Sequence, residues 1–170
     1  LSLFLFSISY LTATKWLDPD FGWHLKTGEL ILERGIPRVD WYTFTMPDFP
    51  WVNHEWLADV FIFKIHSLYG FQVLLLIFLV IATLAFFISA KLSYFWYCLM
   101  PLVLGYFACL PFFGMRPQLL TAFFVAILAK ILNNFLENPN SRLIYLCPIL
   151  FLIWVNLHGG FFAGIFILFL

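Results

Sequence analysis

The feature that most constrains this chain is a run of 20 residues without a charge, Phe71–Ala90, which is followed by Lys91. About 20 apolar residues in an α-helix span the hydrocarbon of a bilayer. Hydrophobic residues make up 64% of the chain and charged residues only 11%, whereas a soluble domain has about 25% charged residues. The chain is therefore expected to fold mainly in lipid.

Further apolar runs predict six membrane-spanning helices and an all-α fold, a polytopic transmembrane helical bundle. The predicted spans are about 1–14, 71–90, 94–113, 118–136, 143–157 and 161–170. The first and last begin and end within apolar sequence, so we expect the N-terminal part of one polytopic membrane domain. Cys98, Cys109 and Cys147 lie in apolar stretches and are interpreted as small buried hydrophobic residues.

The order in which these spans cross the membrane predicts the orientation of the protein in it. The short connections that hold Lys91 and Arg142 fall on one side, and short basic loops mark the cytoplasm. The 15–70 loop then lies on the outer, periplasmic side of a bacterial cytoplasmic membrane. The net charge is zero, which gives no reason to expect a nucleic acid partner, so the lipid bilayer is the predicted partner.

The outer loop 15–70 contains eight of the nine acidic residues, between positions 18 and 59. Asp18 as N-cap and Pro19 predict a helix over 19–34. A second helix is predicted over 53–69, starting at Asn53 and ending before Gly70. It is amphipathic, with Trp56, Val60 and Phe63 on one face, so we expect it along the membrane interface.

Four polar groups from separate segments are expected at the outer boundary, where helix N-termini favour anions. They are Asp18, Asp20 and His24; Asn53, His54 and Glu55; Arg116 and Gln118; and Asn156 and His158. Their common side predicts a shared polar pocket with carboxylates, imidazoles and one guanidinium.

Each group also has a structural interpretation. Asp18 and Asp20 are typical of a helix N-terminus, although with His24 they suit a divalent cation such as Mg²⁺ or Mn²⁺, or an acid–base pair. Asn53 is typical of an N-cap. Arg116 suits either headgroup contact or a phosphate clamp.

Aromatic residues leave a similar choice. Trp23, Trp41 and Trp51 are typical of an aromatic belt at the membrane interface, and a sugar ring stacked on one of them is the alternative.

Several strings carry a resemblance. They are Asp18-Pro-Asp-Phe-Gly-Trp-His-Leu, Trp51-Val-Asn-His-Glu-Trp-Leu, Met115-Arg-Pro-Gln and Trp154-Val-Asn-Leu-His-Gly-Gly. They look like those of a large group of uncharacterised bacterial polytopic proteins. The loop aspartates after the first span resemble the GT-C superfamily of membrane glycosyltransferases, which includes protein O-mannosyltransferases and aminoarabinose transferases.

The resemblance implies transfer of a sugar from a polyprenyl-phosphate donor at the outer membrane face. It implies a catalytic carboxylate at Asp18 or Asp20, which would act as general base or help to hold a metal, and a contact of Arg116 with the donor phosphate. From their place in the four polar groups, the candidates for binding substrate or phosphate are His24, His54, Glu55, Gln118, Asn156 and His158. The acidic pair of the mannosyltransferases is adjacent, whereas Pro19 separates the two aspartates here.

Two other functions are compatible with the sequence, a multi-span transporter and a non-catalytic membrane assembly protein. A transporter is expected to have ionisable residues near the bilayer midplane. The predicted spans 71–90 and 94–113 contain none.

Overall fold

The computed structural model describes residues 2–14, 18–89 and 95–169. Apart from a single β-bridge between Val39 and Pro50, the regular structure in these residues is helical, which confirms the all-α prediction. The elements are α1 (Ser2–Ala13), α2 (Phe21–Arg34), α3 (Trp56–Ser89), α4 (Phe95–Cys109), η2 (Leu110–Phe112), α5 (Gln118–Glu137), η3 (Arg142–Leu146), α6 (Cys147–Leu157) and α7 (Phe161–Leu168).

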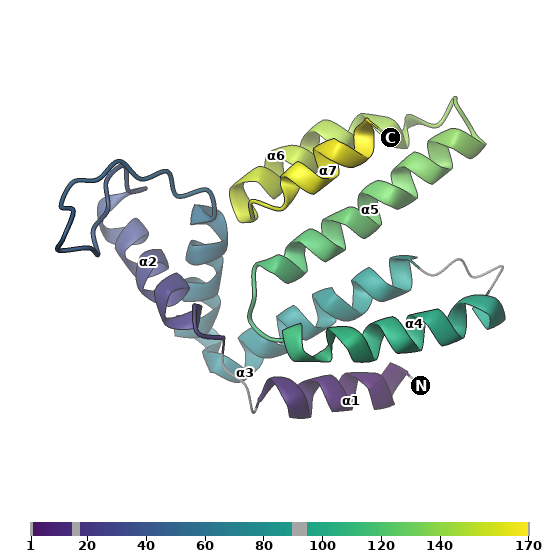
Figure 1. Ribbon diagram of the computed structural model, residues 1–170, viewed down its shortest axis with the longest axis horizontal. Coiled ribbons are helices and arrows are strands. Elements are labelled where there is room, and N and C mark those ends of the chain that lie inside the picture. The colour runs from purple at the N-terminus through teal and green to yellow at the C-terminus, as the bar shows by residue number, and fades with distance from the viewer. Residues whose placement is uncertain (1, 15–17, 90–94, 170) are drawn as a thin grey trace.

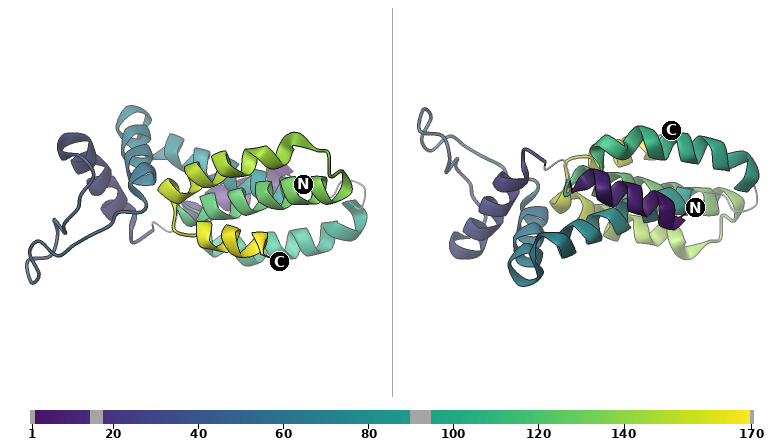
Figure 2. Two further views of the ribbon diagram at one scale, coloured as in Figure 1. Left: turned by 90° about the horizontal axis from the view of Figure 1, so that it is seen from above. Right: turned by 90° about the horizontal axis from the view of Figure 1, so that it is seen from below.

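The helices form two groups with different directions (Figure 1). The C-terminal part of α3 runs alongside α1, α4, α5, α6 and α7 in an elongated bundle. Helix α2 and the N-terminal part of α3 lie across one end of this bundle (Figure 2). The predicted loop helices therefore form a separate layer at the end of the apolar helices.

A kink at Gly70 joins the two parts of α3. The residue has φ 80° and ψ 177°, a conformation that is open essentially only to glycine. The predicted helix end at this residue thus appears as a change of direction between the loop layer and the bundle.

Within the described residues, two helices are long and apolar enough to cross a membrane, α3 and α5. The other predicted spans are helical over their described residues but are shorter. The number of membrane crossings remains a prediction.

The centre of the bundle is apolar. Leu74, Phe78 and Leu79 of α3 are fully buried, as are Leu128 of α5 and Trp154 of α6. The Trp154 ring stacks on Phe124 and Phe151, with centroids 5.5 and 5.6 Å away. This packing fixes the ends of α3, α5 and α6 relative to one another.

The loop layer depends on a close contact between α2 and α3. A Cβ atom at Gly28 would lie 2.1 Å from the Asp59 carbonyl oxygen, so only glycine permits this separation. The buried face of the N-terminal part of α3 carries Ala58, Asp59 and Ile62. Trp56, Val60 and Phe63 of the predicted apolar face are half-buried, so the lie of this face along the membrane interface stays a prediction.

Both loop helices begin later than predicted. Asp18 Oδ1 accepts a hydrogen bond from Asp20 N at 2.8 Å, and Asn53 Oδ1 accepts one from Glu55 N at 3.0 Å. These are i to i+2 contacts of Asx turns, not helix caps. The helices consequently start at Phe21 and Trp56 instead of residues 19 and 53.

Candidate functional site

The four predicted polar groups meet at the end of the bundle that carries the loop layer. Arg116 pairs with Asp18, His158 approaches Glu55, and Asn156 accepts a hydrogen bond from Trp56 Nε1 at 2.8 Å. The contacts join the start of α2, the start of α3, the α5 N-terminus and the end of α6. Segments up to 100 residues apart in sequence therefore share one polar cluster.

Asp18 forms an ion pair with Arg116, between Oδ2 and Nε. The carboxylate side chain is 9% exposed, whereas the guanidinium side chain is 29% exposed. Arg116 lies two residues before the first residue of α5, Gln118. One partner is thus buried, while the cation remains accessible from outside the protein.

A second group surrounds Asp59, which sequence reasoning missed. His24 Nδ1 lies 2.7 Å from Asp59 Oδ1, and Asn53 Nδ2 donates to Asp59 Oδ2 at 2.8 Å. All three residues are buried. A signal was present in the sequence, because Asp59 is the one charge among the apolar residues 56–63.

The pKa of His24 is raised above its usual value. Burial is the largest single influence and lowers the pKa, but the hydrogen bond to Asp59 and the charges of Asp59, Glu55 and Asp20 together outweigh it. His24 therefore lies in a negative environment that favours its protonated form.

A third group surrounds Glu55. Its Oε1 atom lies 3.4 Å from both His54 Nε2 and His158 Nε2. His54 is exposed, and the side chain of His158 is only 16% exposed. Gly159 leaves room for this approach, since a Cβ atom there would lie 3.1 Å from the His54 ring.

The other nitrogen of His158 faces the bundle. Thr121 Oγ1 lies 2.6 Å from His158 Nδ1, and Gly160 N donates to the same nitrogen at 3.0 Å. Burial lowers the pKa of His158, and the charges of His54 and His24 lower it further, against the opposing effect of Glu55. The imidazole is thus held neutral with Nδ1 as an acceptor.

Two predicted residues lie apart from these contacts. Asp20 is exposed and its side chain makes no capping hydrogen bond. Gln118 is exposed in the first turn of α5. Both remain predicted site residues.

The predicted metal ligands Asp18, Asp20 and His24 do not form a ligand set. Asp18 faces Arg116, and His24 Nδ1 faces Asp59. Among the described residues, no three His, Cys, Asp or Glu side chains are arranged to hold a metal ion. The donors as placed do not fit a divalent cation such as Mg²⁺ or Mn²⁺.

Trp23 and Trp51 of the loop pack on each other and on Tyr42. The Trp23 ring lies 4.0 Å from Tyr42 and 5.7 Å from Trp51, between centroids. Tyr42 Oη lies 2.7 Å from Thr27 Oγ1, which ties the extended 36–52 segment to α2. Trp23 and Trp51 thus also serve to hold the 36–52 segment against α2, and Trp23 stays partly exposed.

No protein-family model, curated protein or solved structure matches the chain. The fold and the cluster define its class without such a match. Over the residues that the structure describes, it is an all-helical protein with two helices of membrane-spanning length and a polar cluster at one end of the helical bundle.

Proposed function

We propose that the protein is a membrane glycosyltransferase, which moves a sugar from a polyprenyl-phosphate-linked donor to an acceptor at the outer face of the bacterial cytoplasmic membrane. The observation that carries this proposal is the accessible Arg116 guanidinium, paired with Asp18 among carboxylates and imidazoles. The cluster supplies both a cation for phosphate and groups that can accept a proton.

The position of Arg116 suits a lipid-linked phosphate. The residue lies between the apolar helix α4 with η2 and the apolar helix α5. A polyprenyl chain requires an apolar environment, and its phosphate requires a cation at the adjacent polar boundary. Guanidinium binds phosphate oxygens through paired hydrogen bonds. Asp18 occupies Nε of this guanidinium, which orients the fork and leaves the terminal nitrogens for the donor.

The pairing also separates the two aspartates to which the resemblance assigns the catalytic carboxylate. Asp18 positions Arg116, while Asp20 is exposed near His24. Transfer of the sugar breaks the bond between its anomeric carbon and the phosphate oxygen, and polyprenyl phosphate is the product whichever aspartate is catalytic. Recognition of this common product is thus independent of the sugar and of the acceptor.

The test is binding of a long-chain polyprenyl phosphate to the full-length protein in lipid nanodiscs. Polyprenol without phosphate is the control ligand. We expect Arg116→Gln to weaken phosphate-dependent binding by about 10–100-fold, because a hydrogen bond to a charged group contributes about 1.5–3 kcal/mol. Arg142→Gln at the opposite end of the bundle is the matched control and should leave binding unchanged.

Equal affinity of the wild type for polyprenyl phosphate and polyprenol would refute the proposal. Flux of a solute through proteoliposomes without sugar transfer would favour a transporter instead. Capture of a partner by the 15–70 loop, with no phosphate-dependent binding, would favour an assembly protein.

A further inference from the structure

A buried, hydrogen-bonded relay consists of Asn53, Asp59 and His24. It does not include Asp18 or Arg116, the pair proposed to bind phosphate. Both carboxylate oxygens of Asp59 have a partner, His24 Nδ1 at 2.7 Å and Asn53 Nδ2 at 2.8 Å. Asp59 is only 1% exposed, and a buried carboxylate is costly unless it is hydrogen-bonded in this way. The relay is therefore a built arrangement and not a surface contact.

The backbone holds this relay in register. Gly28 lies one helical turn beyond His24 on α2 and contacts the backbone of Asp59. Asn53 is fixed in turn by the hydrogen bond from Glu55 N to its Oδ1 atom. Because the Asn53 oxygen is an acceptor, its Nδ2 group is the donor to Asp59, which identifies the atoms of the amide.

The hydrogen bonds determine the tautomer of His24. An ionised carboxylate only accepts hydrogen bonds, so the proton of the neutral imidazole lies on Nδ1, facing Asp59. The lone pair is then on Nε2, the nitrogen required of a general base whose other side is oriented by a carboxylate.

The charges around His24 come from every element that packs near it. Asp59 on α3, Glu55 before α3 and Asp20 before α2 favour the imidazolium form. The charge of His24 in turn lowers the pKa of His158, in the turn between α6 and α7. A proton taken up at Nε2 would thus be stabilised by three carboxylates.

We propose that His24, oriented by Asp59, is the general base that takes the proton from the acceptor hydroxyl, and that Asp59 and Asn53 are its positioning residues. This inference rests on the proposed glycosyl transfer. The acceptor oxygen forms a bond to the anomeric carbon of the sugar as its proton passes to Nε2. The bond from that carbon to the phosphate oxygen breaks, and polyprenyl phosphate leaves with the electron pair. His24 later releases the proton to water.

The first experiment measures the tautomer by ¹⁵N NMR of histidine-labelled full-length protein in detergent micelles. The sequence has only four histidines, so His54→Gln, His66→Gln and His158→Gln assign the His24 signals. We expect the Nδ1–H form in the wild type and in Asp20→Asn. In Asp59→Asn the new amide donates to Nδ1, so we expect the Nε2–H form with an intact fold.

The second experiment measures sugar transfer from polyprenyl-phosphate-linked sugars in proteoliposomes. We expect His24→Gln and Asp59→Asn to lower kcat by about 10²–10⁴-fold, the range of general base catalysis, with unchanged binding of polyprenyl phosphate. The low-pH limb of the kcat profile should disappear in His24→Gln. Asp48→Asn, at an exposed loop position outside the polar cluster, should keep both the limb and the rate.

The inference is overturned if the wild-type His24 carries its proton on Nε2, or if His24→Gln transfers sugar at the wild-type rate while Asp20→Asn does not. Absence of phosphate-dependent binding in the wild type would instead refute the glycosyltransferase, and the proposed base with it. Failure of the general base and failure of the glycosyltransferase can be told apart, because the NMR measurement of His24 needs neither the sugar donor nor the sugar acceptor.

Discussion

His158 shows how neighbouring groups determine the state of a single residue. Its Nδ1 atom accepts a hydrogen bond from Gly160 N and so carries no proton. Thr121 Oγ1, which accepts a hydrogen bond from Trp154 Nε1, therefore donates to the same Nδ1 atom. Nε2 therefore carries the proton and faces Glu55. Trp154, Thr121, His158 and Glu55 thus form a chain from the buried core to the polar cluster.

Thr121→Val should destabilise the protein by about 1–3 kcal/mol, because it leaves the Trp154 indole N–H buried without its acceptor and removes a donor to His158. Unfolding in mixed detergent micelles measures the change. Thr83→Val is the matched control, since the Thr83 hydroxyl only donates to Leu79 O within its own helix. We expect less than about 0.5 kcal/mol there. Equal effects at both positions would show that the chain adds no stability.

At the scale of elements, the contact between α2 and α3 determines where the site residues lie. Gly28 allows the two helix backbones to approach, and His24 and Asp59 then meet across the interface. The kink at Gly70 turns this pair of helices across the end of the bundle. The geometry of the proposed base therefore depends on two glycines outside the cluster itself.

Gly28→Ala should cost about 1–3 kcal/mol through overpacking and should lengthen the His24–Asp59 contact, so that the pKa of His24 moves down toward the value set by burial. Thermal unfolding and histidine NMR measure the two effects. Gly22→Ala in the same helix is the control, because nothing lies within 4 Å of its added Cβ atom. A normal His24 signal in Gly28→Ala would contradict the positioning role of this contact.

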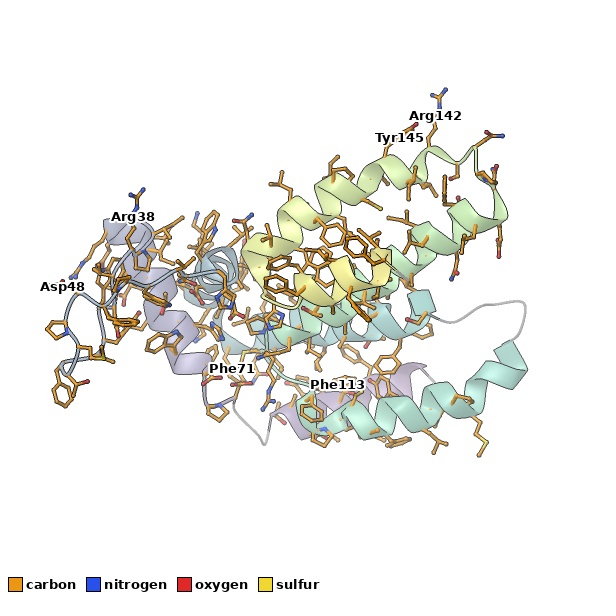
Figure 3. The ribbon with its side chains drawn as sticks, turned by 45° about the horizontal axis from the view of Figure 1, so that its top comes forward. Arg38, Asp48, Phe71, Phe113, Arg142 and Tyr145 are labelled. Atoms are coloured by element: carbon orange, nitrogen blue, oxygen red, sulfur yellow. The ribbon has the colours of Figure 1, made fainter. Side chains whose placement is uncertain are left out.

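At the scale of the whole molecule, polar and basic ends lie on opposite sides of the apolar bundle. Arg38 and Asp48 lie in the loop layer, whereas Arg142 and Tyr145 point away from the protein at the far end (Figure 3). The predicted orientation places the first pair outside the cell and the second in the cytoplasm. A donor bound at Arg116 would then react on the outer side.

Site-specific labelling tests this orientation. We expect a membrane-impermeant maleimide to label Asp48→Cys in intact cells, and Ser141→Cys only after permeabilisation, because short basic loops are retained in the cytoplasm. Cys98, Cys109 and Cys147 are first replaced by Ala in both variants. Labelling of the two positions from the same side would contradict the topology, and the reverse pattern would place the site in the cytoplasm.

The sequence by itself determined that the chain is helical and that polar residues from separate segments collect at one end of the apolar helices. Apolar runs predict helices because backbone groups in lipid must be satisfied within the segment, and Gly70 predicts a helix end because glycine is favoured at helix C-termini. These properties are local, so they are readable from neighbouring residues. The grouping of Asp18, His24, Arg116 and His158 followed from where the segments end.

Only the tertiary structure decided which groups pair. Asp18 was interpreted as a helix N-cap and is the partner of Arg116. Asp59 was not among the predicted site residues and holds His24. Such pairs join residues 35 to 98 positions apart. They depend on the crossing of α2 and α3 and on the packing of the bundle, which are set by the summed contacts of many side chains and not by any local pattern.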